Sequence, residues 1–259
     1  MAKERLPENY LETTIMGLAD IALVGLGALA GGFVSGLTGF GTGITAMGLW
    51  LYALSPPVAA SLVVVCSVIS QAQTLPMIWR TIEWRTVLPY VIPGLLGVPI
   101  GTWLLPHTDA QSFKIGIGFF LVLYAGYVLM RRSSSEHTWG GTPANGAVGF
   151  IGGILGGLSG LSGPAPVVWT DFRGYSKQHR RSVLQAFNLA ILALALVSHA
   201  YSGLLTRQVG WVTLIALPGT IGGAWAGARL YRRLGDHDYQ RIVMILLLLS
   251  GFLLIVTSL

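Results

Sequence analysis

Residues 31–43 of the chain read GGFVSGLTGFGTG, and residues 152–164 read GGILGGLSGLSGP. Over the first nine positions of these two stretches, five residues are identical and the other four are exchanged for similar ones. Farther along, the Pro-Gly pair at 93–94 recurs as the Pro-Gly pair at 218–219. The chain therefore has two halves built on one plan, which is typical of secondary transporters.

Composition places the chain in a membrane. Of its 259 residues, 53% are hydrophobic and only 10% are charged, whereas a soluble domain has about 25% charged residues. The mean hydropathy is +0.67. The 35 glycines and 8 tryptophans suit closely packed membrane helices with anchors at the interface. These figures predict an all-α integral membrane fold.

The same sequence excludes several classes of function. A net charge of +6 does not indicate a nucleic-acid partner, because the basic residues are scattered between apolar runs like the loop charges of a membrane protein. Gly39, Gly41 and Gly43 form a GxGxG pattern, but no Lys-Ser or Lys-Thr follows it as in a phosphate-binding loop. Cys66 is the one cysteine, and the five histidines lack paired spacing, so no metal site or cofactor is expected.

A membrane helix needs about 20 residues, and this length divides each half into one long interrupted run and three ordinary spans. In the first repeat, 18–130, the predicted runs are 18–54, 58–78, 87–105 and 113–130. In the second repeat, 144–259, they are 144–170, 183–205, 211–230 and 239–259. A polar segment, 1–17, precedes the first repeat, and a cytoplasmic linker, 131–143, joins the two. The first run resembles a signal peptide, but its counterpart in the second repeat favours a membrane helix.

The long run at 18–54 cannot be one straight crossing. Its residues 36–43 include four glycines, and each glycine in a helix costs about 1 kcal/mol relative to alanine. The corresponding break at 156–164 ends in Pro164, and Pro166 follows, which interrupts a regular helix. We predict that each half begins with a helical hairpin whose non-helical apex lies inside the membrane, where protein or a wet cavity must satisfy the backbone.

The basic residues predict the orientation. If each hairpin enters the membrane and returns, the two repeats have inverted topology, and the basic residues divide 12 to 4 between the two sides. If each long run crossed only once, the division would be 9 to 7. The positive-inside rule favours the inverted arrangement with both termini on the periplasmic side. The cytoplasmic side then holds Arg80, Arg85, Arg131, Arg132, Arg173, Lys177, Arg180, Arg181, Arg229, Arg232, Arg233 and Arg241. The other side holds Lys3, Arg5, Lys114 and Arg207.

Two hairpins entering from opposite faces would bring their apices together near the membrane midplane. A half-helix that begins there points free amides and its positive dipole end at the centre, which suits an anion. Thr38, Thr42 and Thr45 in one break, with Ser159 and Ser162 in the other, can add hydroxyl donors. Close helix packing is the alternative role of the breaks. We expect packing alone for the glycine pairs 27/31, 97/101 and 223/227.

Amide side chains follow the second break. Gln185 and Asn188 are three residues apart and therefore share a helix face. Buried amides need hydrogen-bond partners, which a ligand, the facing broken backbone or a neighbouring helix can provide. Gln71 and Gln73 lie on the corresponding span of the first half, and their spacing allows at most one of them to point inward.

The sequence leaves the roles of four ionisable residues undecided. Arg173 and Arg181 are candidates for a cytoplasmic vestibule that attracts anions, or else ordinary membrane anchors. Asp20 is the one acidic residue clearly within an apolar run, and it lies near a membrane face. His199 can titrate near neutrality, but a hydrogen-bonded structural histidine is the favoured interpretation.

At this level of detail the sequence resembles the sulfite exporter TauE/SafE family, also called the TSUP family. The resemblance lies in the doubled stretch and in the run Ser-Gly-Pro…Trp…Arg-Gly…Gln-x-Phe-Asn at 162–188, and it extends from about residue 18 to the end of the chain. It implies transport of sulfite or of organosulfonates such as sulfoacetate across a bacterial inner membrane, commonly outward. It also implies substrate-facing positions at Gly36, Thr38, Gly39, Gly41, Thr42, Gly157, Ser159, Gly160, Ser162, Gly163, Gln185 and Asn188. Ser162, Gly163 and Pro164 stand where the first copy has Gly41, Thr42 and Gly43, so the two apices are not expected to be equivalent.

The leading interpretation is an alternating-access exporter of a small sulfur-containing anion, embedded in the lipid bilayer, with a homodimer left open. A passive anion channel or facilitator is the alternative, although its filter would need ligands repeated along a pore. An intramembrane enzyme is not expected, because no nucleophile with a general base is plausibly placed. An inside-negative potential already favours outward anion movement, by about 2.3 kcal/mol per charge per 100 mV, so a coupling carboxylate is not required.

Overall fold

The computed structural model describes residues 16–105, 109–130 and 140–256, and within these residues all regular structure is helical. The helices of the first half are α1 (Leu18–Thr38), α2 (Thr42–Ala53), α3 (Pro56–Thr74), α4 (Trp84–Leu104) and α5 (Ala110–Met130). Those of the second half are α6 (Gly141–Ser159), α7 (Pro164–Phe172), α8 (Lys177–Tyr201), α9 (Arg207–Tyr231) and α10 (Asp236–Val256). Two short 3-10 turns, η2 (Leu75–Met77) and η3 (Trp79–Thr81), connect α3 to α4. Most of the predicted segments 1–17 and 131–143 lies outside the described residues.

Both predicted interruptions are present, and both are shorter than expected. Helix α1 ends at Gly39, whose φ of 80° lies in the left-handed region that favours glycine, and α2 begins three residues later. Helix α6 ends in the same way at Gly160, with a φ of 71°, and α7 begins at Pro164. Each half therefore begins with a long helix, a glycine turn and a shorter returning helix.

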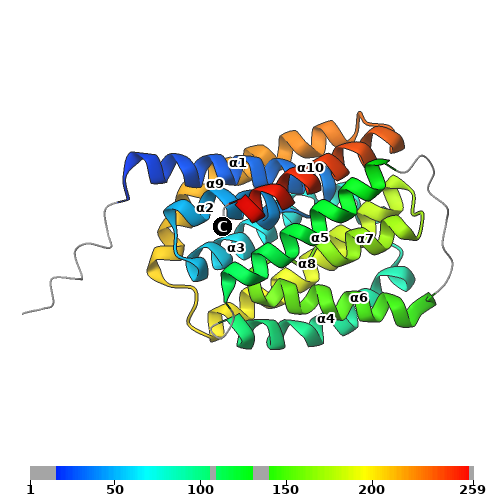
Figure 1. Ribbon diagram of the computed structural model, residues 1–259, viewed down its shortest axis with the longest axis horizontal. Helices are drawn as coiled ribbons and strands as arrows, with labels where there is room; N and C mark the ends of the chain where they lie inside the picture. The colour runs from blue at the N-terminus through cyan, green and yellow to red at the C-terminus, as the bar shows by residue number, and fades with distance from the viewer. Residues whose placement is uncertain (1–15, 106–108, 131–139, 257–259) are drawn as a thin grey trace, which may run out of the picture.

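Two of the closest helix pairs each combine one helix from the first half with one from the second (Figure 1). Helix α1 lies along α9, and α4 lies along α6, while α3 and α8 run between these pairs. Both pairs are parallel: successive glycines of α9 meet successive residues of α1, with Gly219 against Gly25 and Gly227 against Phe33. In the other pair, glycines of α6 meet residues of α4 in the same direction.

Glycine makes these close approaches possible. An added Cβ at Gly223 or Gly227 would overlap a backbone carbonyl of α1, and one at Gly97 or Gly101 would overlap a carbonyl of α6. Gly27 leaves room for the Trp50 ring, whose indole N–H donates to Val24 O at 3.0 Å. The packing role predicted for these small residues is confirmed.

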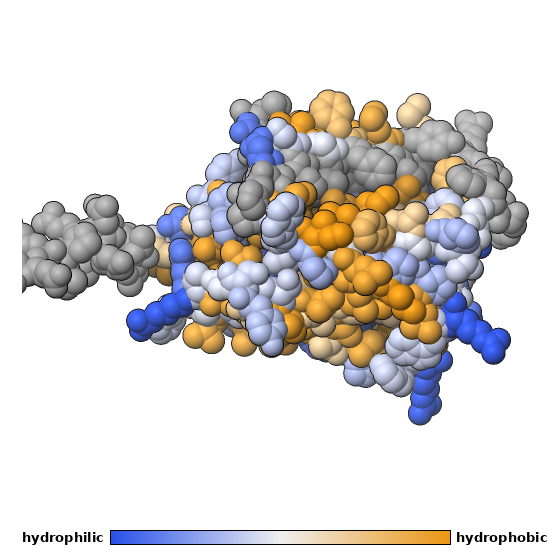
Figure 2. Space-filling view, turned by 90° about the horizontal axis from the view of Figure 1, so that it is seen from below, coloured by the Kyte–Doolittle hydropathy of each residue, from blue (hydrophilic) through white to orange (hydrophobic). Residues whose placement is uncertain are grey.

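Five helices in the described part of the chain are long and apolar enough to cross a membrane: α1, α3 together with η2, α4, α8 and α9. Large apolar side chains such as Leu96, Trp103 and Trp211 are more than half exposed in the chain. Figure 2 shows a broad hydrophobic surface on one face, with hydrophilic side chains toward its two sides. A lipid environment is the solvent in which such a surface is stable.

Candidate functional site

The two helix interruptions meet around a small cavity of about 10 Å³. Residues of both turns contribute to its wall, and α3 and α8 close the sides. The lining residues are Phe40, Gly41, Thr42, Gly43, Ile44, Ser67, Gln71, Gly160, Leu161, Ser162, Gly163, Asn188 and Leu192. A space of this size holds about one water molecule. In this conformation the site is therefore closed around its polar groups.

Two buried polar atoms at this cavity have no hydrogen-bond partner: the hydroxyl oxygen of Thr42 and the side-chain oxygen of Gln71. Both residues are almost completely buried, at 1% exposure each. An unpaired buried polar group costs about 1–3 kcal/mol, so folded proteins seldom retain one without a use. The Gln71 amide can turn over, so it can present either its oxygen or its N–H groups to a ligand. The site therefore has unused hydrogen-bonding capacity.

The two hairpins contribute different chemistry to the cavity. The first turn of any helix leaves backbone amides without partners inside the helix, and in α2 these belong to Thr42, Gly43 and Ile44. In α7 the first and third positions are Pro164 and Pro166, which have no N–H. The donor-rich end is therefore that of α2, in agreement with the expected difference between the two apices.

Asn188 links the two interruptions. Its amide N–H donates to Gly39 O at 3.3 Å, and its side-chain oxygen accepts a hydrogen bond from the Ser162 hydroxyl. Gln185, one turn earlier on α8, faces α3 instead, where it donates to Gln71 O at 3.1 Å and to the Thr74 hydroxyl at 2.9 Å. Both amides are buried, and each has protein partners for its nitrogen and for its oxygen.

Of the twelve residues predicted to face substrate, the structure brings half to the cavity wall: Gly41, Thr42, Gly160, Ser162, Gly163 and Asn188. Gly39 and Gln185 are hydrogen-bonded to lining residues without lining the cavity themselves. The remaining four have other contacts. Gly36 and Gly157 pack against α9 and α4, while the hydroxyls of Thr38 and Ser159 donate to carbonyls of their own helix turns.

The sequence interpretation missed Ser67 of α3 and the apolar wall of the cavity. Ser67 and Gln71 are four residues apart on one face of α3, and the cavity touches both. That spacing is visible in the sequence. Gln71 is buried while Gln73 is exposed, which agrees with the expectation that at most one of them points inward.

The two vestibule candidates lie in different places. Arg173 lines a surface hollow of about 570 Å³. Arg181, in contrast, is completely buried and donates to Leu37 O at 2.8 Å and to Gly36 O at 2.7 Å, with its guanidinium 3.9 Å from the centre of the Tyr231 ring. The prediction that Arg181 lines an open vestibule is therefore wrong for this conformation: it binds the carbonyls at the end of α1.

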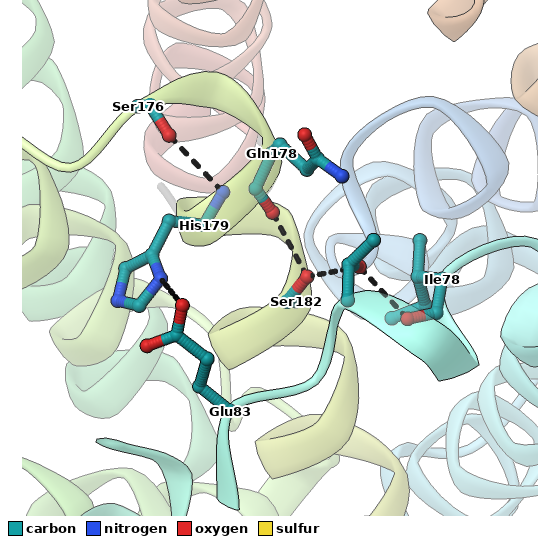
Figure 3. A network of polar contacts seen from close by, with 7 residues as sticks. Ile78, Glu83, Ser176, Gln178, His179 and Ser182 are labelled. Carbon is teal, nitrogen blue, oxygen red and sulfur yellow. Dashed lines mark hydrogen bonds and ion pairs between the residues drawn. The ribbon is translucent and has the colours of Figure 1, made fainter. Parts of the chain in front are cut away.

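The surface hollow is built from the loop before α8 and the connection before α4 (Figure 3). The Ser182 hydroxyl lies 2.8 Å from that of Thr81, and Glu83 lies 3.8 Å from His179. The Ser176 hydroxyl accepts from the His179 amide and caps α8. These contacts hold the end of α3 and the beginning of α8 at the same end of the molecule.

Two further ionisable residues have structural partners. His199 is buried and lies 3.2 Å from the Ser61 hydroxyl and 3.1 Å from Gly157 O, which agrees with the favoured interpretation of a hydrogen-bonded structural histidine. Asp20 accepts a hydrogen bond from the Gly17 amide at the start of α1. Within the described residues, no group of three or more His, Cys, Asp or Glu side chains could hold a metal ion.

Comparison with known proteins identifies a family that matches this chain. The family described as Sulfite exporter TauE/SafE matches residues 23–254, nearly the whole chain. A Bacillus subtilis (strain 168) protein described as "Probable membrane transporter protein YtnM" is 31% identical over 101 residues. These residues are 38% of this chain and 34% of the relative, so the match spans about a third of that protein's length. No solved structure matches the chain.

Proposed function

Because the chain belongs to the sulfite exporter TauE/SafE family, a family of membrane transporters and not of enzymes, we propose that it exports small sulfur-containing anions. The substrates are sulfite or organosulfonates such as sulfoacetate, and the site is the cavity between the two helix interruptions. The observation that carries this proposal is the pair of unpaired buried polar atoms, on Thr42 and Gln71, at that cavity.

The chemistry of the cavity suits an oxyanion. Oxyanions accept hydrogen bonds, and the cavity offers the amides at the start of α2 with the positive end of its helix dipole. The hydroxyls of Thr42, Ser67 and Ser162 lie on the same wall. Arg181 places a buried positive charge at the end of α1, beside the first interruption, and no carboxylate of a described residue forms an ion pair with it. None of the lining residues is acidic, so none would repel an anion.

The two halves, 18–130 and 144–259, act in this proposal as inverted-topology repeats. Helix α3 runs parallel to α1, because the hydroxyls of Ser35 and Ser70 lie 2.8 Å apart near the C-terminal ends of the two helices. Helix α4 follows after a short connection and runs in the opposite direction. Helix α6 runs parallel to α4 and therefore opposite to α1, its counterpart in the first half. Helix α1 packs on α9, and their counterparts in the other half, α6 and α4, pack on each other. This reciprocal packing supports a twofold axis in the membrane plane.

The arginine-rich end is the cytoplasmic side in this proposal, which places both termini in the periplasm of a cell with an inner membrane. Arg80 lies between α3 and α4, and Arg173 lies between α7 and α8. The hydrogen bond between the hydroxyls of Thr81 and Ser182, and that from Lys177 to Tyr231 O at the end of α9, hold these connections at one end of the molecule. The positive-inside rule assigns such an end to the cytoplasm.

The small size of the cavity supports the alternating-access part of the proposal. Its volume of about 10 Å³ cannot hold sulfite, so substrate must enter after one side opens. A continuously open channel would show a wet pore with ligands repeated along it, and the polar groups here gather at one place. A closed cavity between two inverted halves favours the transporter over the channel.

The test is efflux from liposomes that contain the purified protein and are loaded with sulfite, sulfoacetate or taurine. We expect saturable efflux of at least one of these compounds, accelerated by unlabelled substrate outside, as a carrier requires. Folded protein without flux of any of the three would refute the proposal. Flux that is not accelerated from the opposite side would indicate the channel alternative.

Two threonines of α2 provide a matched pair for this assay. Thr42→Val removes a hydroxyl that has no protein partner, so we expect about a tenfold higher KM with little loss of stability. Thr45→Val removes a hydroxyl that donates to Gly41 O at 3.0 Å, so we expect an unchanged KM and a loss of stability of about 1 kcal/mol. Equal KM values in the two variants would argue against a substrate contact at Thr42.

A further inference from the structure

Lys177, Arg180 and Arg181 lie at the beginning of α8, and two of them, Lys177 and Arg181, stack on the ring of Tyr231. Lys177 lies 4.3 Å from the centre of the Tyr231 ring and donates to Tyr231 O at 2.9 Å. Arg181 stacks on the same ring and donates to two carbonyls at the end of α1 and to the Gln185 side chain. The hydrogen-bonding groups of both side chains are thus engaged by protein atoms.

Arg180 is different, because most of its guanidinium is unused. It is only 5% exposed, and its Nη2 contacts a carboxylate oxygen of Asp171 at 2.7 Å. Its Nε and Nη1 are buried and have no hydrogen-bond partner. A buried charged group normally satisfies all its donors, and one that does not costs considerable free energy. The closed conformation therefore holds two donor nitrogens of a charged group without an acceptor.

Each of these two nitrogens shares an edge of the guanidinium with Nη2, and these edges define a ligand chemistry. A guanidinium presents its N–H groups in a planar fork that matches two oxygens of one carboxylate, sulfonate or sulfite group. Asp171 occupies one branch of that fork in the closed state. Asp171 and Arg180 flank the loop that lines the surface hollow, and Arg181, the next residue, reaches the first interruption. Arg180 is therefore adjacent in sequence both to His179, which lines the hollow, and to Arg181, which binds the end of α1 beside the first interruption.

We propose that Arg180 is a second oxyanion-binding site, which a small sulfonate, sulfite or carboxylate occupies during its passage between the hollow and the cavity. Asp171 is the internal competitor: it holds the guanidinium when the path is closed and yields it to the anion when the path opens. This proposal rests on the proposed transport function, but anion binding tests it without transport.

The experiment measures the melting temperature of the detergent-purified full chain during titration with sodium sulfite and with sodium methanesulfonate, at an ionic strength kept constant with sodium chloride. Arg180→Lys keeps the positive charge but loses the planar fork, and we expect about a tenfold weaker apparent affinity. Asp171→Asn removes the competitor, and we expect tighter binding and a larger stabilisation by either oxyanion than in the unaltered chain.

The Lys variant separates contact from distant electrostatics. If Arg180 acted only as a distant charge, the Arg180→Lys variant would bind oxyanions with unchanged affinity, and that result would overturn the proposal. An Asp171→Asn variant that binds oxyanions no more tightly than the unaltered chain would also overturn it. Arg229→Gln is the control, because this exposed arginine near the same end stacks on Trp225, and its loss should change neither affinity. If the unaltered chain binds oxyanions but moves none in liposomes, the proposed function fails while the Arg180 site stands.

Discussion

Replacing Asn188 by aspartate is expected to lower the rate of sulfite or sulfonate transport at subsaturating substrate by about a hundredfold. Asp is nearly the same size and keeps the oxygen that accepts from Ser162, but it loses the N–H that donates to Gly39 O, so part of the effect is the loss of that contact. The new carboxylate would stand at the cavity wall, about 5 Å from a bound anion, where repulsion in a partly buried site amounts to about 3 kcal/mol. Efflux from liposomes loaded with sulfite measures the effect.

Asn145 offers the same substitution away from the cavity. It is also buried, and its side-chain oxygen accepts from the Trp169 indole at 2.7 Å, a bond that Asp can keep. We expect Asn145→Asp to transport within a few-fold of the unaltered protein. Similar losses in both variants would mean that buried negative charge harms the fold in general, and the assignment of the cavity as the anion site would lose its support.

Replacing Gly227 by alanine is expected to destabilise the protein by about 1–3 kcal/mol, the usual cost of overpacking a dense interior. A Cβ at this position would overlap the carbonyl oxygen of Phe33, so α1 and α9 would have to separate. Gly222 lies on the same helix, and no atom approaches the place of its added Cβ within 4 Å. Gly222→Ala should be neutral or slightly stabilising, because alanine favours helix by about 1 kcal/mol.

The melting temperatures of the two alanine variants in detergent compare these effects directly. A lower value for Gly227→Ala and an unchanged or higher value for Gly222→Ala are the expected outcome. Equal melting temperatures would contradict the close parallel packing of α1 on α9. Since that reciprocal packing supports the inverted-repeat proposal, the comparison also bears on how the two halves move.

Much of this fold follows from local sequence rules. Helix interiors exclude glycine clusters and proline, so the breaks near Gly39 and Gly160 could be located from residue type alone. The role of Gly97 and Gly223 in close helix packing followed from their small size and spacing. The internal repeat then placed the two breaks in equivalent positions, which is why half of the predicted site residues reach one cavity.

The rest of the site depends on distant contacts that local rules do not encode. Arg181 looked like an interfacial charge, because such residues at the start of a membrane span usually face water. Its burial follows from the end of α1, where Gly36 and Leu37 present carbonyls that need donors. Ser67 was missed because the face of α3 that meets the cavity depends on how α3 and α8 cross.

The cavity also bears on how transport is driven. None of its lining residues is ionisable, so the proposed site binds the anion by hydrogen bonds and dipoles and contains no carboxylate to carry a coupled proton. An inside-negative membrane potential alone favours export by about 2.3 kcal/mol per charge per 100 mV. Export through such a site should therefore accelerate as the imposed potential becomes more negative inside.

In the proposed mechanism the cavity between the two interruptions opens to each side of the membrane in turn. Ser67→Cys in a Cys66→Ala background places the one thiol of the chain at the cavity wall with almost no change in size. A membrane-impermeant thiol reagent carrying a sulfonate should then label this residue from either side of sealed vesicles, and sulfite should slow labelling from both sides. Labelling from one side only, or labelling that sulfite does not slow, would contradict the account.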